Sequence, residues 1–159
     1  MHQGKRLTLV HLSDPQFGDK HGFAQDTSMG SLADRLATSF ECLRDEHDVR
    51  PDLVIVSGDL AERGLPSEFK DVEAFLRSLA RSLTLDMRRI VVVPGNHDIN
   101  RDKAHAYFLD CGVDELVPKL PYWPKYEPYA KFFKRLYAGD EDVRFTESEP
   151  FTFYEYPEL

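Results

Sequence analysis

The sequence contains no long hydrophobic run. Its first apolar stretch, Leu7–Leu12, is much shorter than the core of a signal peptide and ends at a polar turn, so we predict neither a secretion signal nor a membrane-spanning segment. Cysteine is also scarce, because only Cys42 and Cys111 are present, each within a helical pattern. This pattern favours buried thiols over a disulfide or a thiolate site, and we expect a cytoplasmic protein.

Clusters of basic residues are absent as well. The chain carries 20 lysine and arginine residues against 28 aspartate and glutamate residues, which gives a net charge of -8. We therefore expect no extended binding to duplex nucleic acid. An acidic chain can still bind a small phosphate compound, because bound divalent metal ions reverse the local charge of an acidic pocket.

The length and composition are those of one globular domain. The chain has 159 residues, of which 42% are hydrophobic and 30% are charged. These proportions are typical of a folded chain that can bury a hydrophobic core. Because we find no internal repeat or low-complexity tract, we expect residues 1–159 to form a single domain.

Three short apolar runs alternate with two helical patterns. The runs are Leu7–Leu12, Leu53–Val56 and Ile90–Val93, and the helical patterns cover residues 31–47 and 67–83. Continuous apolar runs are typical of strands that are buried on both faces of a parallel sheet. The order predicts an α/β fold with a β-α-β-α-β core and right-handed crossovers.

Three further elements are predicted after the third strand. A helix capped by Asn100 should end at Gly112, and a second helix should cover residues 126–138. Aromatic residues at helical spacing in this second helix favour a place in the core over a pocket wall. A strand is expected over residues 151–156.

The residues that directly follow the three strands are of the types that bind metal ions. Asp14, Asp59 and Asn96 follow the three apolar runs at nearly equal spacing, and Gly58 and Gly95 precede two of them. Parallel strands bring their carboxyl ends to one edge of a sheet, where ligands bind. Each residue alone is more typical of a turn or a helix cap. Three in register predict one cluster of oxygen ligands, with the glycines allowing a close backbone approach.

These motifs together resemble the ordered signature of calcineurin-like metallophosphoesterases. The resemblance rests on Asp14-Pro15-Gln16, Gly58-Asp59 and the tetrapeptide 95–98, and covers residues 7–101. It implies that the chain is the N-terminal half of a four-layer α/β/β/α sandwich. Residues 102–159 would then be a helical insertion and the start of the next strand, and a longer protein could carry a further C-terminal domain.

The resemblance also implies a centre with two divalent metal ions. Asp14 and Gln16 would bind the first ion, Asp59 would bridge both, and Asn96 would bind the second. Manganese is the expected metal, with iron, zinc or magnesium as alternatives. A carboxylate suits the bridging position because its two oxygens can each bind one cation.

A catalytic pair and a substrate contact follow from the same resemblance. His97 would act as a general acid or phosphate contact, with Asp98 orienting its ring and raising its pKa. Asn96, His97 and Arg101 would contact the substrate phosphate. His97 as an ordinary loop residue and Arg101 as a partner in a surface ion pair remain the alternatives.

The sequence departs from the family pattern in two ways. Gln16 stands where most members have histidine, which offers an amide oxygen in place of an imidazole nitrogen. The further histidines that members supply downstream are absent, since only His105 follows His97 and its helical position favours a surface or core role. An incomplete domain is the expected reason.

The predicted function is a metal-dependent phosphoester hydrolase, a phosphomonoesterase or phosphodiesterase that acts on a small phosphoester or nucleotide through a metal-activated water. The alternative is a non-catalytic recognition or regulatory module with a degenerate site. A dinucleotide-binding domain is disfavoured, because residues 13–18 lack the glycine pattern of a phosphate cradle.

Overall fold

The computed structural model describes residues 6–19, 29–119 and 123–159. It contains three strands, four α-helices and two short 3₁₀-helices among these residues. In chain order the elements are β1 (Leu9–Ser13), α1 (Met29–His47), β2 (Leu53–Gly58), α2 (Pro66–Ser82), η1 (Met87–Arg89), β3 (Ile90–Pro94), α3 (Arg101–Val113), η2 (Trp123–Lys125) and α4 (Glu127–Leu136).

The three strands form one parallel sheet in the order β1-β2-β3. Leu12 pairs with Val56, and Val56 pairs with Val92, so all three strands run in the same direction and end close together. The predicted α/β fold and its β-α-β-α-β order are therefore confirmed. The carboxyl ends of the strands lie at one edge, where the loops after β1, β2 and β3 meet.

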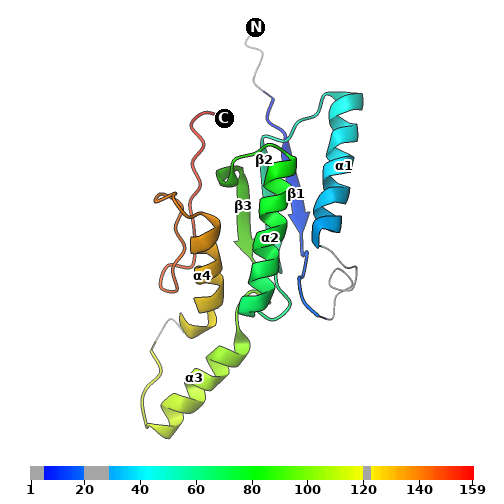
Figure 1. The fold of residues 1–159 in the computed structure, drawn as a ribbon. Coiled ribbons are helices and arrows are strands. Elements are labelled where there is room, and N and C mark those ends of the chain that lie inside the picture. The colour runs from blue at the N-terminus through cyan, green and yellow to red at the C-terminus, as the bar shows by residue number, and fades with distance from the viewer. Residues whose placement is uncertain (1–5, 20–28, 120–122) are drawn as a thin grey trace.

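Helices cover one face of this sheet in the described part of the chain. Figure 1 shows α2 in front of the sheet, with α1 and α4 on either side of it. Val56 and Ile90 are fully buried under these helices, whereas Leu9 is 53% and Val93 45% exposed on the other face. The expectation that the strands are buried on both faces is wrong for β1 and for Val93 of β3, since no described element covers these outward residues.

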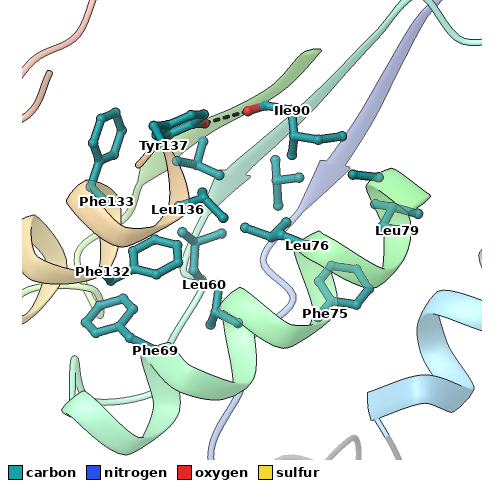
Figure 2. Packing of buried hydrophobic residues seen from close by; sticks show 14 of the residues in the cluster. Leu60, Phe69, Phe75, Leu76, Leu79, Ile90, Phe132, Phe133, Leu136 and Tyr137 are labelled. Carbon is teal, nitrogen blue, oxygen red and sulfur yellow. Dashed lines mark hydrogen bonds between the residues drawn. The ribbon is translucent and has the colours of Figure 1, made fainter. Parts of the chain in front are cut away.

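The hydrophobic core lies between the sheet, α2 and α4 (Figure 2). Phe69 of α2 stacks on Phe132 of α4 with ring centroids 5.1 Å apart, and Tyr129 contacts both rings. Each aromatic side chain that is removed from water stabilises the fold by about 1.5–3 kcal/mol. The expectation that the aromatic residues near the end of the chain belong to the core is confirmed for α4.

Helix α3 extends away from this core (Figure 1). The Asn100 side chain accepts a hydrogen bond from the Lys103 N–H, 2.9 Å away, so the predicted cap is confirmed. The apolar side chains of α3 are only partly buried, because Cys111 is buried and Phe108 is 39% exposed. Cys42 is also exposed, so the expectation of two buried thiols holds for Cys111 alone.

The predicted strand over residues 151–156 is wrong, because this segment forms no strand. It is attached to the free edge of β3 by side chains instead of by a backbone ladder. The Tyr156 hydroxyl donates to the Arg88 carbonyl just before β3. The Tyr154 hydroxyl donates over 3.1 Å to the hydroxyl of Tyr137, which in turn donates to the Ile90 carbonyl of β3. A strand forms only where its backbone pairs with a neighbouring strand, and here side chains make the contacts at the edge of β3 instead.

No described helix has the length and apolar character needed to cross a bilayer.

Candidate metal and phosphate site

The candidate site lies where the loops after β1, β2 and β3 meet. The Asp59 N–H donates to Asp14 Oδ1 over 3.2 Å, and the His97 N–H donates to Asp59 Oδ1 over 2.9 Å. Hydrogen bonds thus join all three loops at Asp59, through its backbone N–H on one side and its carboxylate on the other. The predicted convergence of oxygen donors at one edge of the sheet is present for Asp14 and Asp59.

Two glycines make room for these carboxylates. A Cβ atom at Gly58 would lie 2.4 Å from Asp14 Oδ1, and one at Gly95 would lie 2.2 Å from Asp59 Oδ1. Real Cβ atoms do not approach oxygen so closely. Gly58 also has a φ of +81°, which side-chain-bearing residues rarely adopt. Both glycines are therefore required by the close approach of the loops.

The loop after β1 has strained backbone at two candidate ligands. Asp14 has a φ of 52° and Gln16 a φ of 44°, in the left-handed region that disfavours residues with a Cβ. Such a conformation costs roughly 1–3 kcal/mol per residue and clusters at functional sites. Backbone hydrogen bonds offset this cost, since the N–H groups of Gln16 and Phe17 donate to the carbonyls of Asp59 and Leu60 over 2.9 Å and 2.8 Å.

The two oxygens of Asp59 face different neighbours. Oδ1 accepts from the His97 N–H, while Oδ2 lies 3.5 Å from the side-chain amide nitrogen of Gln16. Turning the Gln16 side-chain amide over would place its oxygen near the present position of its nitrogen. Asp59 therefore has one oxygen facing the loop after β1 and one facing the loop after β3.

The donor set fits hard divalent cations better than soft ones. The described residues contain no cluster of three or more His, Cys, Asp or Glu side chains that could hold a metal ion. The four predicted ligands are the carboxylates of Asp14 and Asp59 and the amides of Gln16 and Asn96, of which Asn96 is exposed. Oxygen-only ligands of this kind suit Mn²⁺ and Mg²⁺.

His97 is held by a backbone group. Its Nδ1 atom lies 2.6 Å from the carbonyl oxygen of Glu62, in the loop after β2. Because a carbonyl can only accept, Nδ1 carries the hydrogen and Nε2 is left to exchange a proton. A backbone carbonyl has no signature in the sequence, so Glu62 was not predicted as part of the site.

The expectation that Asp98 orients the His97 ring is wrong. The Asp98 side chain is 0% exposed, and its oxygens accept hydrogen bonds from the backbone N–H groups of Leu60, Ala61 and Gly95 at 2.8–3.1 Å. Burial raises the pKa of Asp98 to about 7, while these donors pull it down. Asp98 therefore fastens the loop after β3 to the loop after β2, because its carboxylate saturates backbone donors on both.

A surface hollow of about 180 Å³ adjoins the ring of His97. Arg101, the first residue of α3, is exposed at its wall. Arg101 and His97 thus line the same hollow. The lining residues are Glu62, Arg63, His97, Ile99, Arg101 and Asp102.

A family model described as calcineurin-like phosphoesterase matches residues 7–154. An uncharacterised metallophosphoesterase-like protein of Bacillus subtilis (strain 168) is 33% identical over 110 residues, which cover 66% of this chain and 22% of the relative. A glycerophosphodiester phosphodiesterase of Enterobacter lignolyticus is 34% identical over 119 residues, covering 72% of this chain and 34% of the relative.

A third relative is a cAMP/cGMP dual specificity phosphodiesterase of Mycobacterium tuberculosis. It is 28% identical over 114 residues, which cover 69% of this chain and 32% of the relative. The chain thus spans about a third or less of the length of each of these three proteins.

Proposed function

Because this chain belongs to the calcineurin-like phosphoesterase family, we propose that it contributes the N-terminal part of a metal-dependent phosphoester hydrolase. The observation that carries the proposal is the meeting of Asp14, Asp59 and the loop of residues 95–98 at one edge of the sheet. Two relatives are named as phosphodiesterases, which favours a phosphodiester over a phosphomonoester as substrate. A small phosphodiester or nucleotide is the proposed substrate class.

We propose that Asp14 and Gln16 hold one divalent cation, Asn96 a second, and Asp59 both. When bound, the two cations would neutralise phosphoryl charge and lower the pKa of a water that attacks phosphorus. Manganese is the proposed metal and magnesium fits the same oxygens, whereas iron and zinc would need ligands beyond those that this donor set provides.

His97 is the proposed general acid, with Asp98 as the residue that keeps its loop in place. The contact between Nδ1 and the Glu62 carbonyl fixes the ring and leaves Nε2 to hold the proton. In hydrolysis, the water oxygen forms a bond to phosphorus and the bond from phosphorus to the departing ester oxygen breaks. Nε2 gives its proton to that oxygen, which leaves as an alcohol. Asn96 and Arg101 are the proposed phosphate contacts beside it.

The wider architecture and setting are part of the same proposal. We propose that residues 7–101 are the motif-bearing core of an incomplete domain, and that residues 102–159 are an insertion leading to further strands. The whole protein would form a four-layer α/β/β/α sandwich, in which other segments cover the exposed face of β1. A further C-terminal domain and a cytoplasmic location belong to this proposal.

The competing candidate is a non-catalytic recognition or regulatory module. The donor set of two carboxylates and two amides favours it, because neutral amides bind cations more weakly than imidazoles or carboxylates. The two candidates predict different metal contents. The chain is therefore loaded with Mn²⁺, and bound metal is measured together with turnover of para-nitrophenyl phosphate and its bis-ester.

Stoichiometric manganese with turnover of the bis-ester is the expected result. Asp59→Ala should lose both properties. Asp45 is exposed on helix α1, so Asp45→Ala should keep both properties and serves as the matched control. A chain that neither binds manganese nor turns over either ester, also when extended downstream, would refute the hydrolase and favour the recognition module.

A further inference from the structure

The loop after β2 lies against the loop after β3 and is bonded to it through two carbonyl groups. The Glu62 carbonyl oxygen lies 2.6 Å from Nδ1 of His97, and the Gly64 carbonyl accepts from Nδ2 of Asn100 over 3.2 Å. Gly64 has a φ of +66°, and a Cβ there would lie 2.9 Å from the carbonyl oxygen of Asp98. The two loops are therefore in close contact at Gly64 and hydrogen-bonded through alternate carbonyl groups.

The opposite side of the loop after β2 is bonded to one carboxylate. Buried Glu68 accepts with Oε2 from the backbone N–H groups of Arg63 and Leu65, over 3.0 Å and 2.8 Å. The peptide units 62–63 and 64–65 thus each have their N–H on Glu68 and their carbonyl on the loop after β3. Because a peptide unit is planar, a bond at one end orients the other end. The direction of the Glu62 carbonyl therefore depends on both sets of hydrogen bonds.

Asn100 is itself held firmly enough to anchor this loop. It is 5% exposed, and its backbone N–H donates to the Lys125 carbonyl over 2.8 Å. Its Oδ1 atom accepts from the Lys103 N–H over 2.9 Å, which is the cap of α3. Because a backbone N–H can only donate and a carbonyl can only accept, these partners decide which end of the amide faces Gly64. The Nδ2 atom is therefore the end that binds the loop after β2.

Loss of the bond from Nδ2 would act on the ring of His97. Without it, the peptide unit 64–65 could rotate about its remaining bond to Glu68, and the preceding peptide unit would move with it. The Glu62 carbonyl would then shift relative to Nδ1 of His97. A misplacement of about 1 Å in a reacting group can slow a reaction by about a hundredfold. A small change at Gly64 is therefore large enough to matter for proton transfer by His97.

We infer that Asn100 is a positioning residue for the proposed general acid: its Nδ2 atom holds the loop after β2 so that the Glu62 carbonyl keeps the His97 ring oriented. The inference rests on the proposed hydrolase function. The cap of α3 is a separate role, because it uses the Oδ1 atom. Serine caps a helix about as well as asparagine, but its single oxygen cannot occupy the positions of both ends of the amide. Asn100→Ser therefore keeps the cap and loses the anchor.

Two phosphodiesters that differ in their leaving group test the inference. Methyl para-nitrophenyl phosphate releases a stable phenolate that needs little help from an acid, whereas methyl phenyl phosphate releases a more basic oxygen that needs a proton. The ratio of kcat/KM for the phenyl ester to kcat/KM for the nitrophenyl ester is measured in the manganese-loaded chain. We expect Asn100→Ser to lower this ratio about tenfold, because a displaced His97 transfers its proton less well. A smaller folded fraction would lower both rates equally and leave the ratio unchanged.

Two more variants separate the anchor from the cap. Asn100→Ala loses both, so it should lower the ratio as Asn100→Ser does and also lower the midpoint of unfolding in urea. The control is Asp86→Ala, which removes the exposed cap of η1 at the opposite end of β3, where Asp86 accepts from the Arg88 N–H over 2.8 Å. This control should leave the ratio unchanged. The same ratio in the wild type and in Asn100→Ser would overturn the inference and leave the proposed hydrolysis intact.

Absence of turnover for both esters in the wild type would refute the proposed function instead. The metal-free chain with isotope-labelled histidine is then studied by NMR, and His97→Gln identifies the signal of the His97 ring. The Nδ1–H group should exchange slowly with water in the wild type, because it is bonded to the Glu62 carbonyl. Loss of this slowly exchanging signal in Asn100→Ser would support the positioning role. The same signal in both proteins, or none in the wild type, would overturn it.

Discussion

Replacing Gly95 by alanine is the sharpest test of the close approach of the three loops. The new Cβ would lie 2.2 Å from Asp59 Oδ1, 2.6 Å from the carbonyl carbon of Gly58 and 2.7 Å from the Asp59 nitrogen. Two of these atoms belong to the backbone, so a rotamer change cannot relieve the contact. Overpacking of this kind costs about 1–3 kcal/mol, and the displaced bond from the His97 N–H to Asp59 adds about 1 kcal/mol.

The change is measured as the free energy of unfolding in urea, followed by circular dichroism. We expect Gly95→Ala to be less stable than the wild type by about 2–4 kcal/mol. It should also bind Mn²⁺ more weakly in calorimetry, because Asp59 is the proposed bridging ligand. Gly112→Ala is the control, since a Cβ there meets nothing within 4 Å and lies within α3. It should be more stable by up to about 1 kcal/mol.

An unchanged urea midpoint for Gly95→Ala, together with unchanged manganese affinity, would refute this reasoning. It would mean that the loops after β2 and β3 can separate without loss. The bridging position of Asp59 would then lose its support.

Three further outcomes are expected. Asp98→Asn should destabilise the chain in urea by about 1–3 kcal/mol, because an amide nitrogen would face a backbone donor; an unchanged midpoint would contradict its fastening role. Hydrogen bonds from Lys103 and Lys131 lower the pKa of Glu127 below 4.5, so its stabilising effect is present above 4.5 and is lost as the pH falls through the lowered pKa. When the free energy of unfolding is measured against pH, Glu127→Gln should not show this loss of stability at acidic pH. Added manganese should raise the midpoint of unfolding in urea, and a chelator should reverse this rise. In Asp14→Ala, manganese should leave the midpoint unchanged.

Local signals in the sequence were sufficient to predict most of the fold. The apolar runs at Leu53–Val56 and Ile90–Val93 lie within β2 and β3, because β-branched residues favour strands and these runs are too short for helices. Asn100 was predicted as a cap because its side chain can satisfy a free N–H at a helix start. The meeting of Asp14 and Asp59 followed from the parallel order alone.

Features that depend on tertiary contacts escaped prediction. The Glu62 carbonyl that holds His97 belongs to the backbone, and any residue type would supply it. The family resemblance assigned Asp98 to the His97 ring, whereas its buried carboxylate binds backbone N–H groups of another loop. The left-handed backbone at Asp14 and Gln16 likewise depends on hydrogen bonds to a distant segment.

The tyrosine hydroxyls at the edge of β3 allow variation in chain length. A backbone ladder demands that each residue of a segment match a residue of its neighbour, so an insertion shifts every later pair. Tyr154 and Tyr156 instead attach their segment at separate points, Tyr154 through the Tyr137 hydroxyl and Tyr156 through the Arg88 carbonyl. Insertions and deletions between the buried Phe145 and Tyr154 should therefore be tolerated during evolution, provided that the phenol groups still reach their partners.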